Sequence, residues 1–135
     1  MQFTKAEEYG LFGLIYLAKQ AGNGVSTLRE ISQAQDVPDK FLAKIFQNLT
    51  KAGIIKSHRG VRGGFTLARP ARKISVAEVF DAIQANEDPI KCVINRKDCP
   101  KKYSCPVREL VMEGRRHMFS YYGKHTIQSL ADQYA

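Results

Sequence analysis

Residues 26–67 place a short helix, a tight turn, a second helix and a glycine-rich hairpin in direct succession, an order that few folds accommodate. Ser26 or Thr27 caps the first helix, which ends by Gln35, and Pro38 suits the first turn of the second, which runs to about Ala52. Residues 53–68 then predict a strand, a tip and a returning strand. A hairpin directly after a helix-turn-helix is the wing of a winged helix, so we expect that fold.

The second helix of this pattern has two faces. Apolar residues at helical spacing are expected to pack against the core, namely Phe41, Leu42, Ile45, Phe46 and Leu49. An amphipathic helix with a solvated face would look the same in isolation, but here a hairpin follows. Because the amino-terminal part of a recognition helix enters the major groove, the candidates for DNA contact on it are Asp39, Lys40, Ala43, Lys44, Gln47 and Lys51.

The hairpin tip adds His58, Arg59 and Arg62, and arginines on a wing can reach phosphates or a narrow minor groove. Charge supports a polyanion as partner, because residues 40–73 contain no Asp or Glu in a chain of net charge +8. Their nine basic residues are Lys40, Lys44, Lys51, Lys56, Arg59, Arg62, Arg69, Arg72 and Lys73. We therefore expect double-stranded DNA as the partner, and no nucleotide-binding motif or catalytic arrangement indicates an enzyme.

Further helices flank this unit. Thr4 with Glu7 and Ser75 with Glu78 match capping boxes, and Thr126 caps a last short helix. Pro106 starts a long helix whose apolar stripe is expected to join two subunits into a homodimer: Val107, Leu110, Val111, Gly114, Met118, Tyr121 and Tyr122. The expected fold is mainly α with a small β-hairpin wing. We divide the chain into a DNA-binding unit, 1–87, and a unit of cysteine loop and dimerisation helix, 88–135.

All three cysteines of the chain, Cys92, Cys99 and Cys105, fall in one short basic loop. Thiolates clustered in this way favour a soft-metal or iron-sulfur site, and an odd number cannot be closed by disulfides within one chain. A chain of 135 residues can build a core without metal, which favours a functional site. No membrane-spanning run or signal-peptide pattern is present, so we expect a cytoplasmic protein whose thiols stay reduced.

Four segments together resemble the Rrf2 family of bacterial iron-sulfur regulators, whose members include IscR and NsrR. They are the helix-turn-helix stretch 41–55, the wing 59–70, the helix 74–83 and the three-cysteine loop, in order over nearly the whole chain. The resemblance implies a homodimeric winged-helix repressor with one [4Fe-4S] or [2Fe-2S] cluster per subunit near the dimer interface. Such a protein would sense redox state, nitric oxide or iron supply and change its DNA affinity with cluster state.

Two positions decide the fourth ligand that the resemblance implies. Members like IscR place a histidine three residues after the last cysteine, where this chain has Arg108, which stays protonated and cannot bind iron. Members like NsrR use a carboxylate from the first helix of the partner subunit, and Glu8 matches that position. Glu7 is explained by capping, whereas Glu8 has no such capping role. An ordinary exposed glutamate is the alternative, with His117 or His125 then completing the site.

The nature of the metal centre stays open between three interpretations. The first cysteine interval is one residue longer than in several family members, which leaves the cluster type undecided. Zinc accepts three cysteines with a carboxylate or histidine, so a zinc-stabilised or cluster-free DNA-binding regulator is the main alternative. An electron-transfer protein is disfavoured, because the bacterial ferredoxin spacing is shorter and the wing would have no purpose.

Overall fold

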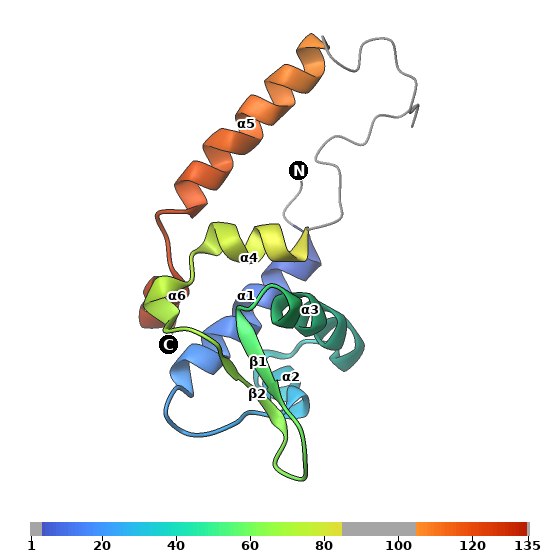
Figure 1. The fold of residues 1–135 in the computed structure, drawn as a ribbon, viewed down its shortest axis with the longest axis vertical. Helices are drawn as coiled ribbons and strands as arrows, with labels where there is room; N and C mark the ends of the chain where they lie inside the picture. Colours follow the sequence, from blue (N-terminus) through green and yellow to red (C-terminus); the bar gives the residue numbers. More distant parts are fainter. Residues whose placement is uncertain (1–3, 85–104, 135) are drawn as a thin grey trace.

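A computed structural model describes residues 4–84 and 105–134, and these residues form a mainly helical body with one antiparallel hairpin (Figure 1). The elements in chain order are α1 (Lys5–Lys19), α2 (Leu28–Gln35), α3 (Asp39–Lys51), β1 (Ile55–His58), β2 (Gly64–Leu67), the 3-10 turn η1 (Ala71–Lys73), α4 (Val76–Ile83), α5 (Pro106–Tyr122) and α6 (Ile127–Gln133). The predicted order of helices and hairpin is confirmed.

Local capping signals set the starts of several helices. Glu7, Glu30 and Glu78 each accept a hydrogen bond from the backbone N–H of the residue that caps their helix, as the capping boxes predicted. Pro38 occupies the cap of α3, one residue before the first turn. These bonds satisfy amide donors that a helix start otherwise leaves open, so the sequence defines these ends without tertiary contacts.

The core lies where α1, α2, α3 and α4 meet the base of the hairpin. Its fully buried side chains include Leu14, Ile31, Leu42, Phe46, Leu49, Ile54, Ile55, Ile74, Val79 and Ile127. Ile127 shows that α6 returns to pack on the same body, beside α1. One predicted core position is wrong: Phe41 is 63% exposed, because it lies on the flank of α3 and not on the line of Leu42, Ile45 and Phe46.

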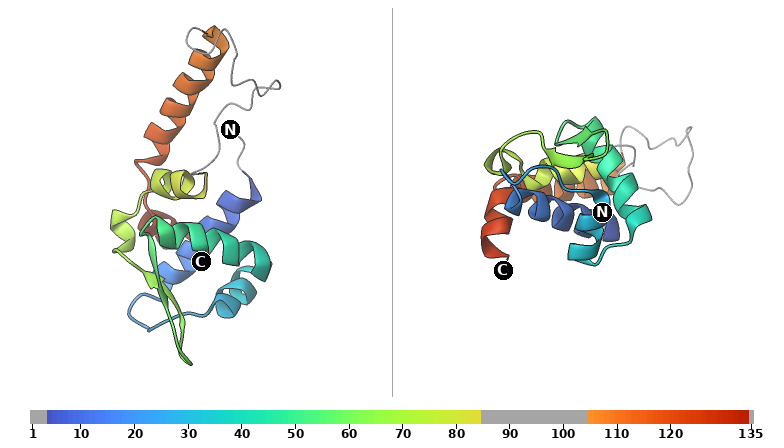
Figure 2. Two further views of the ribbon diagram at one scale, coloured as in Figure 1. Left: turned by 45° about the vertical axis from the view of Figure 1, so that its right-hand side comes forward. Right: turned by 90° about the horizontal axis from the view of Figure 1, so that it is seen from below.

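Helix α5 extends away from this body, and the hairpin projects from the other end of the molecule (Figures 1 and 2). No residue of α5 is buried within the described chain. Its contacts with the body lie towards its carboxyl end, where Tyr122 packs edge-on against Phe80 at 4.8 Å between ring centroids and Arg115 lies 3.8 Å from Asp81. Most of the apolar stripe on α5 therefore faces solvent in a single protomer.

Glu7 joins the start of α1 to the end of α4. Its side chain is 3% exposed, and its carboxylate accepts hydrogen bonds of 2.9 Å from the Thr4 amide and from the Gln84 side chain. Burial acts to raise the pKa of Glu7, but the hydrogen bonds from Thr4 and Gln84 outweigh it and hold the pKa below its usual value. The charged form is therefore the one that stabilises the fold.

Replacing Glu7 with glutamine is expected to lower the free energy of unfolding by about 1–2 kcal/mol at pH 7, because one of the two oxygens that accept from Thr4 and from Gln84 would become an NH2 donor. The folded-state pKa of Glu7 is depressed, so its contribution is present above the usual value of 4.5 and lost as the pH falls through the folded value. Urea unfolding from pH 7 down to about pH 3 should show parent and variant converging in acid. Glu109→Gln on the exposed face of α5 is the control. If parent and Glu7→Gln differed by the same unfolding free energy at pH 7 and at about pH 3, the stabilising role of the charged Glu7 carboxylate would be contradicted.

Candidate functional site

The outer face of α3 presents every residue predicted there for DNA contact. All six are exposed, namely Asp39, Lys40, Ala43, Lys44, Gln47 and Lys51. The opposite face of α3 is anchored by Leu42, Ile45, Phe46 and Leu49, so the outer face has a fixed orientation. The lysines make this outer face positively charged, and a phosphate backbone can approach it.

The turn between α2 and α3 is held by contacts that sequence reasoning missed. Asp36 ends α2 in the left-handed conformation at φ 53°, and Val37 is buried. The Ser32 hydroxyl lies 2.5 Å from the Val37 carbonyl and also contacts the Asp39 carboxylate. Asp39 therefore helps to fix the entry into α3. The one acidic member of the predicted set thus has a partner inside the protein, and the lysines beside it dominate the charge of the surface.

The hairpin is closed by glycines and braced by His58. Strand pairing places His58 opposite Gly64, and the turn between them has Gly60 at φ 110°. A Cβ on Gly63 would lie 2.6 Å from the His58 carbonyl oxygen, so only glycine fits this tip. The His58 ring lies 2.9 Å from the Thr66 hydroxyl across the strands. Arg59 and Arg62 are exposed at the tip, as predicted.

The hairpin and α3 are joined through Phe65. Its ring packs edge-on against Phe46 of α3 at 5.0 Å between centroids. Its backbone exchanges hydrogen bonds of 3.1 and 2.7 Å with Ser26, which leads into α2. Gly64 is required beside this bridge, because a Cβ there would lie 2.3 Å from the Ser26 carbonyl oxygen. The base of the hairpin is thus joined to α3 and to the start of α2, so the wing and α3 belong to one packed unit.

The predicted cluster ligands are only partly within the described chain, because Cys92 and Cys99 lie outside the described residues. Cys105 caps the start of α5 and is half-buried. Arg108 follows within the first turn and is also half-buried. The amino end of a helix carries partial positive charge, a setting that favours an anionic ligand such as a thiolate.

Glu8 projects from the first half of α1, and its side chain is 36% exposed. It forms an ion pair with Lys5 at 3.2 Å, a local partner that the capping comparison with Glu7 did not consider. The Lys5 side chain is 73% exposed, and a solvent-exposed pair one turn apart contributes only about 0.3–0.5 kcal/mol. Such a weak pair can be exchanged for a stronger ligand interaction.

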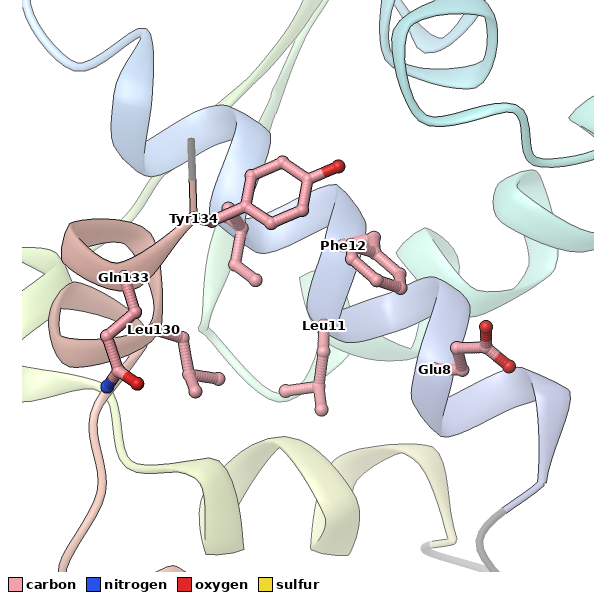
Figure 3. Close-up of a pocket in the computed structure, with 7 residues that line it drawn as sticks. Glu8, Leu11, Phe12, Leu130, Gln133 and Tyr134 are labelled. Carbon is pink, nitrogen blue, oxygen red and sulfur yellow. The ribbon is translucent and has the colours of Figure 1, made fainter.

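A pocket of about 440 Å³ opens beside Glu8 between α1 and α6 (Figure 3). Its lining is mostly apolar and comprises Glu8, Leu11, Phe12, Ile15, Leu130, Gln133 and Tyr134. Phe12 and Tyr134 pack edge-on there at 5.6 Å between ring centroids. Glu8 is the acidic group at the edge of an otherwise largely apolar surface.

The described residues of one protomer do not assemble a metal site. Among residues 4–84 and 105–134, no three His, Cys, Asp or Glu side chains lie close enough to hold a metal ion. The start of α1 and the Cys105 end of α5 lie well apart in Figure 1 and in the left view of Figure 2. His117 lies 3.2 Å from Glu113, and the His125 ring packs on Tyr121 at 4.9 Å. Within these described parts, neither histidine approaches Cys105 and Glu8 in a ligand group.

Comparison with known proteins gives a consistent result. The chain matches the Rrf2 family, described as "Iron-dependent Transcriptional regulator", over residues 3–133. It is 30% identical over 130 residues to the protein rrf2 of Nitratidesulfovibrio vulgaris, covering 96% of this chain and 87% of that protein. It is 35% identical over 86 residues to the HTH-type transcriptional regulator IscR of Cereibacter sphaeroides, covering 62% and 56% of the two chains.

A solved structure confirms the predicted winged-helix architecture. The oxidized form of CymR from Staphylococcus aureus superposes with a TM-score of 0.72 at 26% identity, over 100% of this chain and 98% of that one.

No helix in the described ranges, 4–84 and 105–134, is long and apolar enough to cross a membrane.

Proposed function

Because the chain belongs to the Rrf2 family of transcriptional regulators, we propose that it is a homodimeric repressor whose affinity for operator DNA is set by an iron-sulfur cluster. Family membership confirms the prediction of a regulator and not an enzyme. The cluster would report redox state, nitric oxide or iron supply. In this proposal residues 1–87 read DNA, and residues 88–135 carry the cluster loop and the dimerisation helix.

One observation carries the DNA-binding part of the proposal: α3 and the wing tip present exposed basic side chains from one packed unit. Lys40, Lys44 and Lys51 lie on the outer face of α3, and Arg59 and Arg62 lie at the wing tip. The Phe46–Phe65 contact holds the two elements together. We expect α3 to enter the major groove, with Gln47 and Lys44 able to reach base edges, while His58 and the tip arginines reach the backbone or the minor groove.

The dimer is proposed because the apolar stripe of α5 is exposed in a single protomer. This helix has 17 residues, and none of them is buried within the described chain. Most helix stability in proteins comes from packing of an apolar face, which a solvent-exposed helix lacks. The exposed Val107, Leu110 and Tyr121 would supply that face to the same helix of a second copy. Two recognition helices would then read two half-sites.

For the cluster, the donor types of the chain fit the group. Cys92, Cys99 and Cys105 would hold it by thiolates, and Arg108 would contribute no ligand. Since α1 and the Cys105 end of α5 lie apart in one protomer, Glu8 would have to serve the site of the other subunit. Its weak pair with Lys5 would be broken in exchange. When bound, the cluster supplies iron that reacts with oxidants or nitric oxide.

A cluster-free or zinc-bound regulator is the second candidate function. Zinc would bind the same thiolates with Glu8 or a histidine in tetrahedral geometry. Visible absorption separates the two candidates, because an iron-sulfur cluster is coloured whereas zinc and free thiols are not.

The DNA-binding part is tested by changing Arg59 or Arg62 to alanine. Each variant is expected to bind duplex DNA more weakly, because every phosphate that the protein neutralises releases condensed counterions. The slope of log affinity against log salt should fall by about 0.9 for each phosphate left without its arginine, or roughly 1.8 per dimer. Gel-shift titrations over a series of salt concentrations measure this slope. Lys124→Ala, an exposed lysine just after α5, is the charge-matched control. If the wing variants bound DNA with the parent's affinity at every salt concentration, the wing would not be part of the DNA interface.

A further inference from the structure

Phe41 is an exposed aromatic side chain in the first turn of α3. It is the third residue of that helix and is 63% exposed, although its neighbours Leu42, Ile45 and Phe46 are buried. Leaving a phenylalanine in water forgoes much of the roughly 1.5–3 kcal/mol that its burial would provide. Tyr9 of α1 supports one side of the ring, at 6.4 Å between centroids and an interplanar angle of 54°.

The surroundings of Phe41 are cationic. Lys40 precedes it and Lys44 follows at the next turn, and both are exposed. The Lys5 ammonium, which pairs with Glu8, lies 5.8 Å from the centre of the Tyr9 ring on the neighbouring helix. The nearest acid on α3, Asp39, is engaged by the Ser32 hydroxyl. An apolar protein surface that covered Phe41 would also strip water from Lys40 and Lys44 without pairing them, at a cost in free energy.

The major groove of DNA offers both kinds of partner that this surface needs. Phosphates line its rims and would pair with the lysines, while the 5-methyl group of thymine is an apolar feature on its floor. The first turn of a recognition helix is the part that reaches this floor. An aromatic ring cannot donate a hydrogen bond to a base edge, but it can pack on that methyl group.

We propose that Phe41 contacts the 5-methyl group of a thymine and thereby sets a preference for thymine at one position in each half-site. This inference rests on the proposed DNA-binding function. Tyr9 packs on one side of the Phe41 ring, and the rest of the ring is exposed and can contact the groove. Lys40 and Lys44 would hold the helix in the groove through phosphates, and Phe41 would distinguish thymine from the other bases, which charge alone cannot do.

The test replaces the thymine methyl group without changing any hydrogen bond. Duplexes that the parent protein selects from a random library are prepared with deoxyuridine in place of each thymine of the half-site. The parent is expected to lose about three- to fivefold in affinity at one position, the effect of one buried methyl group. Phe41→Ala should bind the thymine duplex more weakly and should not distinguish thymine from deoxyuridine at that position. Lys51→Ala, the matched control, should weaken binding to both duplexes equally and keep the distinction.

The ways in which this test can fail are distinguishable. If the parent selects and binds no duplex, the proposed function itself is wrong. If the parent binds DNA but tolerates deoxyuridine at every position, or if Phe41→Ala keeps the same sensitivity, the methyl contact is wrong and the proposed function stands. A change in oligomeric state of Phe41→Ala on size-exclusion chromatography, with unchanged DNA selectivity, would assign Phe41 to a protein contact instead.

Discussion

Replacing Leu110 with glutamate is expected to convert the proposed dimer into monomers and to lower operator affinity by more than about 100-fold. Leu110 lies in the apolar stripe of α5 and is 74% exposed in one protomer. In a symmetric dimer the change places two carboxylates in one interface, where burial of unpaired charge costs several kcal/mol. A monomer would engage one half-site at a time and lose the combined affinity of two.

Sedimentation equilibrium and gel shift on the same samples measure both effects. Ser120→Glu is the matched control, because Ser120 is exposed on α5 outside the apolar stripe and should leave both dimer and DNA binding unchanged. Circular dichroism should show that the body of Leu110→Glu stays folded, since its core contains no residue of α5. If Leu110→Glu remained dimeric, the dimer interface would not be formed by this stripe.

Loss of any one cysteine is expected to remove the cluster almost completely and to leave the body folded. Cys105→Ala should lose stoichiometric iron and sulfide after anaerobic reconstitution, and Cys92→Ala and Cys99→Ala should behave in the same way. The buried core of the described residues contains none of these thiols, so thermal unfolding of the cluster-free proteins should match that of the cluster-free parent. A variant that keeps full iron and sulfide would exclude its cysteine from the site.

Mixed dimers show whether Glu8 acts across the interface. In a dimer of Glu8→Ala with Cys105→Ala, ligation across subunits leaves one site with all its ligands and the other without both groups. Ligation within a subunit leaves no intact site. We expect half of the parent's cluster content, with the parent's spectrum and its rate of decay in oxidant. A mixed dimer with no parent-like spectrum, or a Glu8→Ala homodimer identical to the parent, would contradict Glu8 as the ligand from the partner.

The sequence predicted those features that depend on local chemistry. Capping boxes at Thr4, Thr27 and Ser75 identified helix starts, because the partners of each bond lie three residues apart. The glycines of the hairpin tip identified the wing for a similar reason, since the turn itself demands them. The outward face of α3 followed from helical periodicity alone.

What the sequence missed depends mostly on distant or three-dimensional contacts. Helical spacing allowed Phe41 to be assigned to the core, but only the position of α1 shows that its ring lies on the flank beside Tyr9. The Lys5–Glu8 pair is local, and the charge pattern at a spacing of three residues could have revealed it. The link between Ser26 and Phe65 joins segments far apart in the chain, and no local signal marks it.

The most direct test of the proposed function follows cluster and DNA affinity in the same anaerobic preparation. We expect a coloured protein with stoichiometric iron and sulfide per subunit, and a change in operator affinity of at least about tenfold, the size of common allosteric couplings, when nitric oxide or oxygen destroys the cluster. Absorption and paramagnetic resonance spectra would follow the cluster, and gel shifts of the same sample would follow the DNA. A colourless protein that holds zinc, or an operator affinity that is the same with and without the cluster, would contradict cluster-controlled repression.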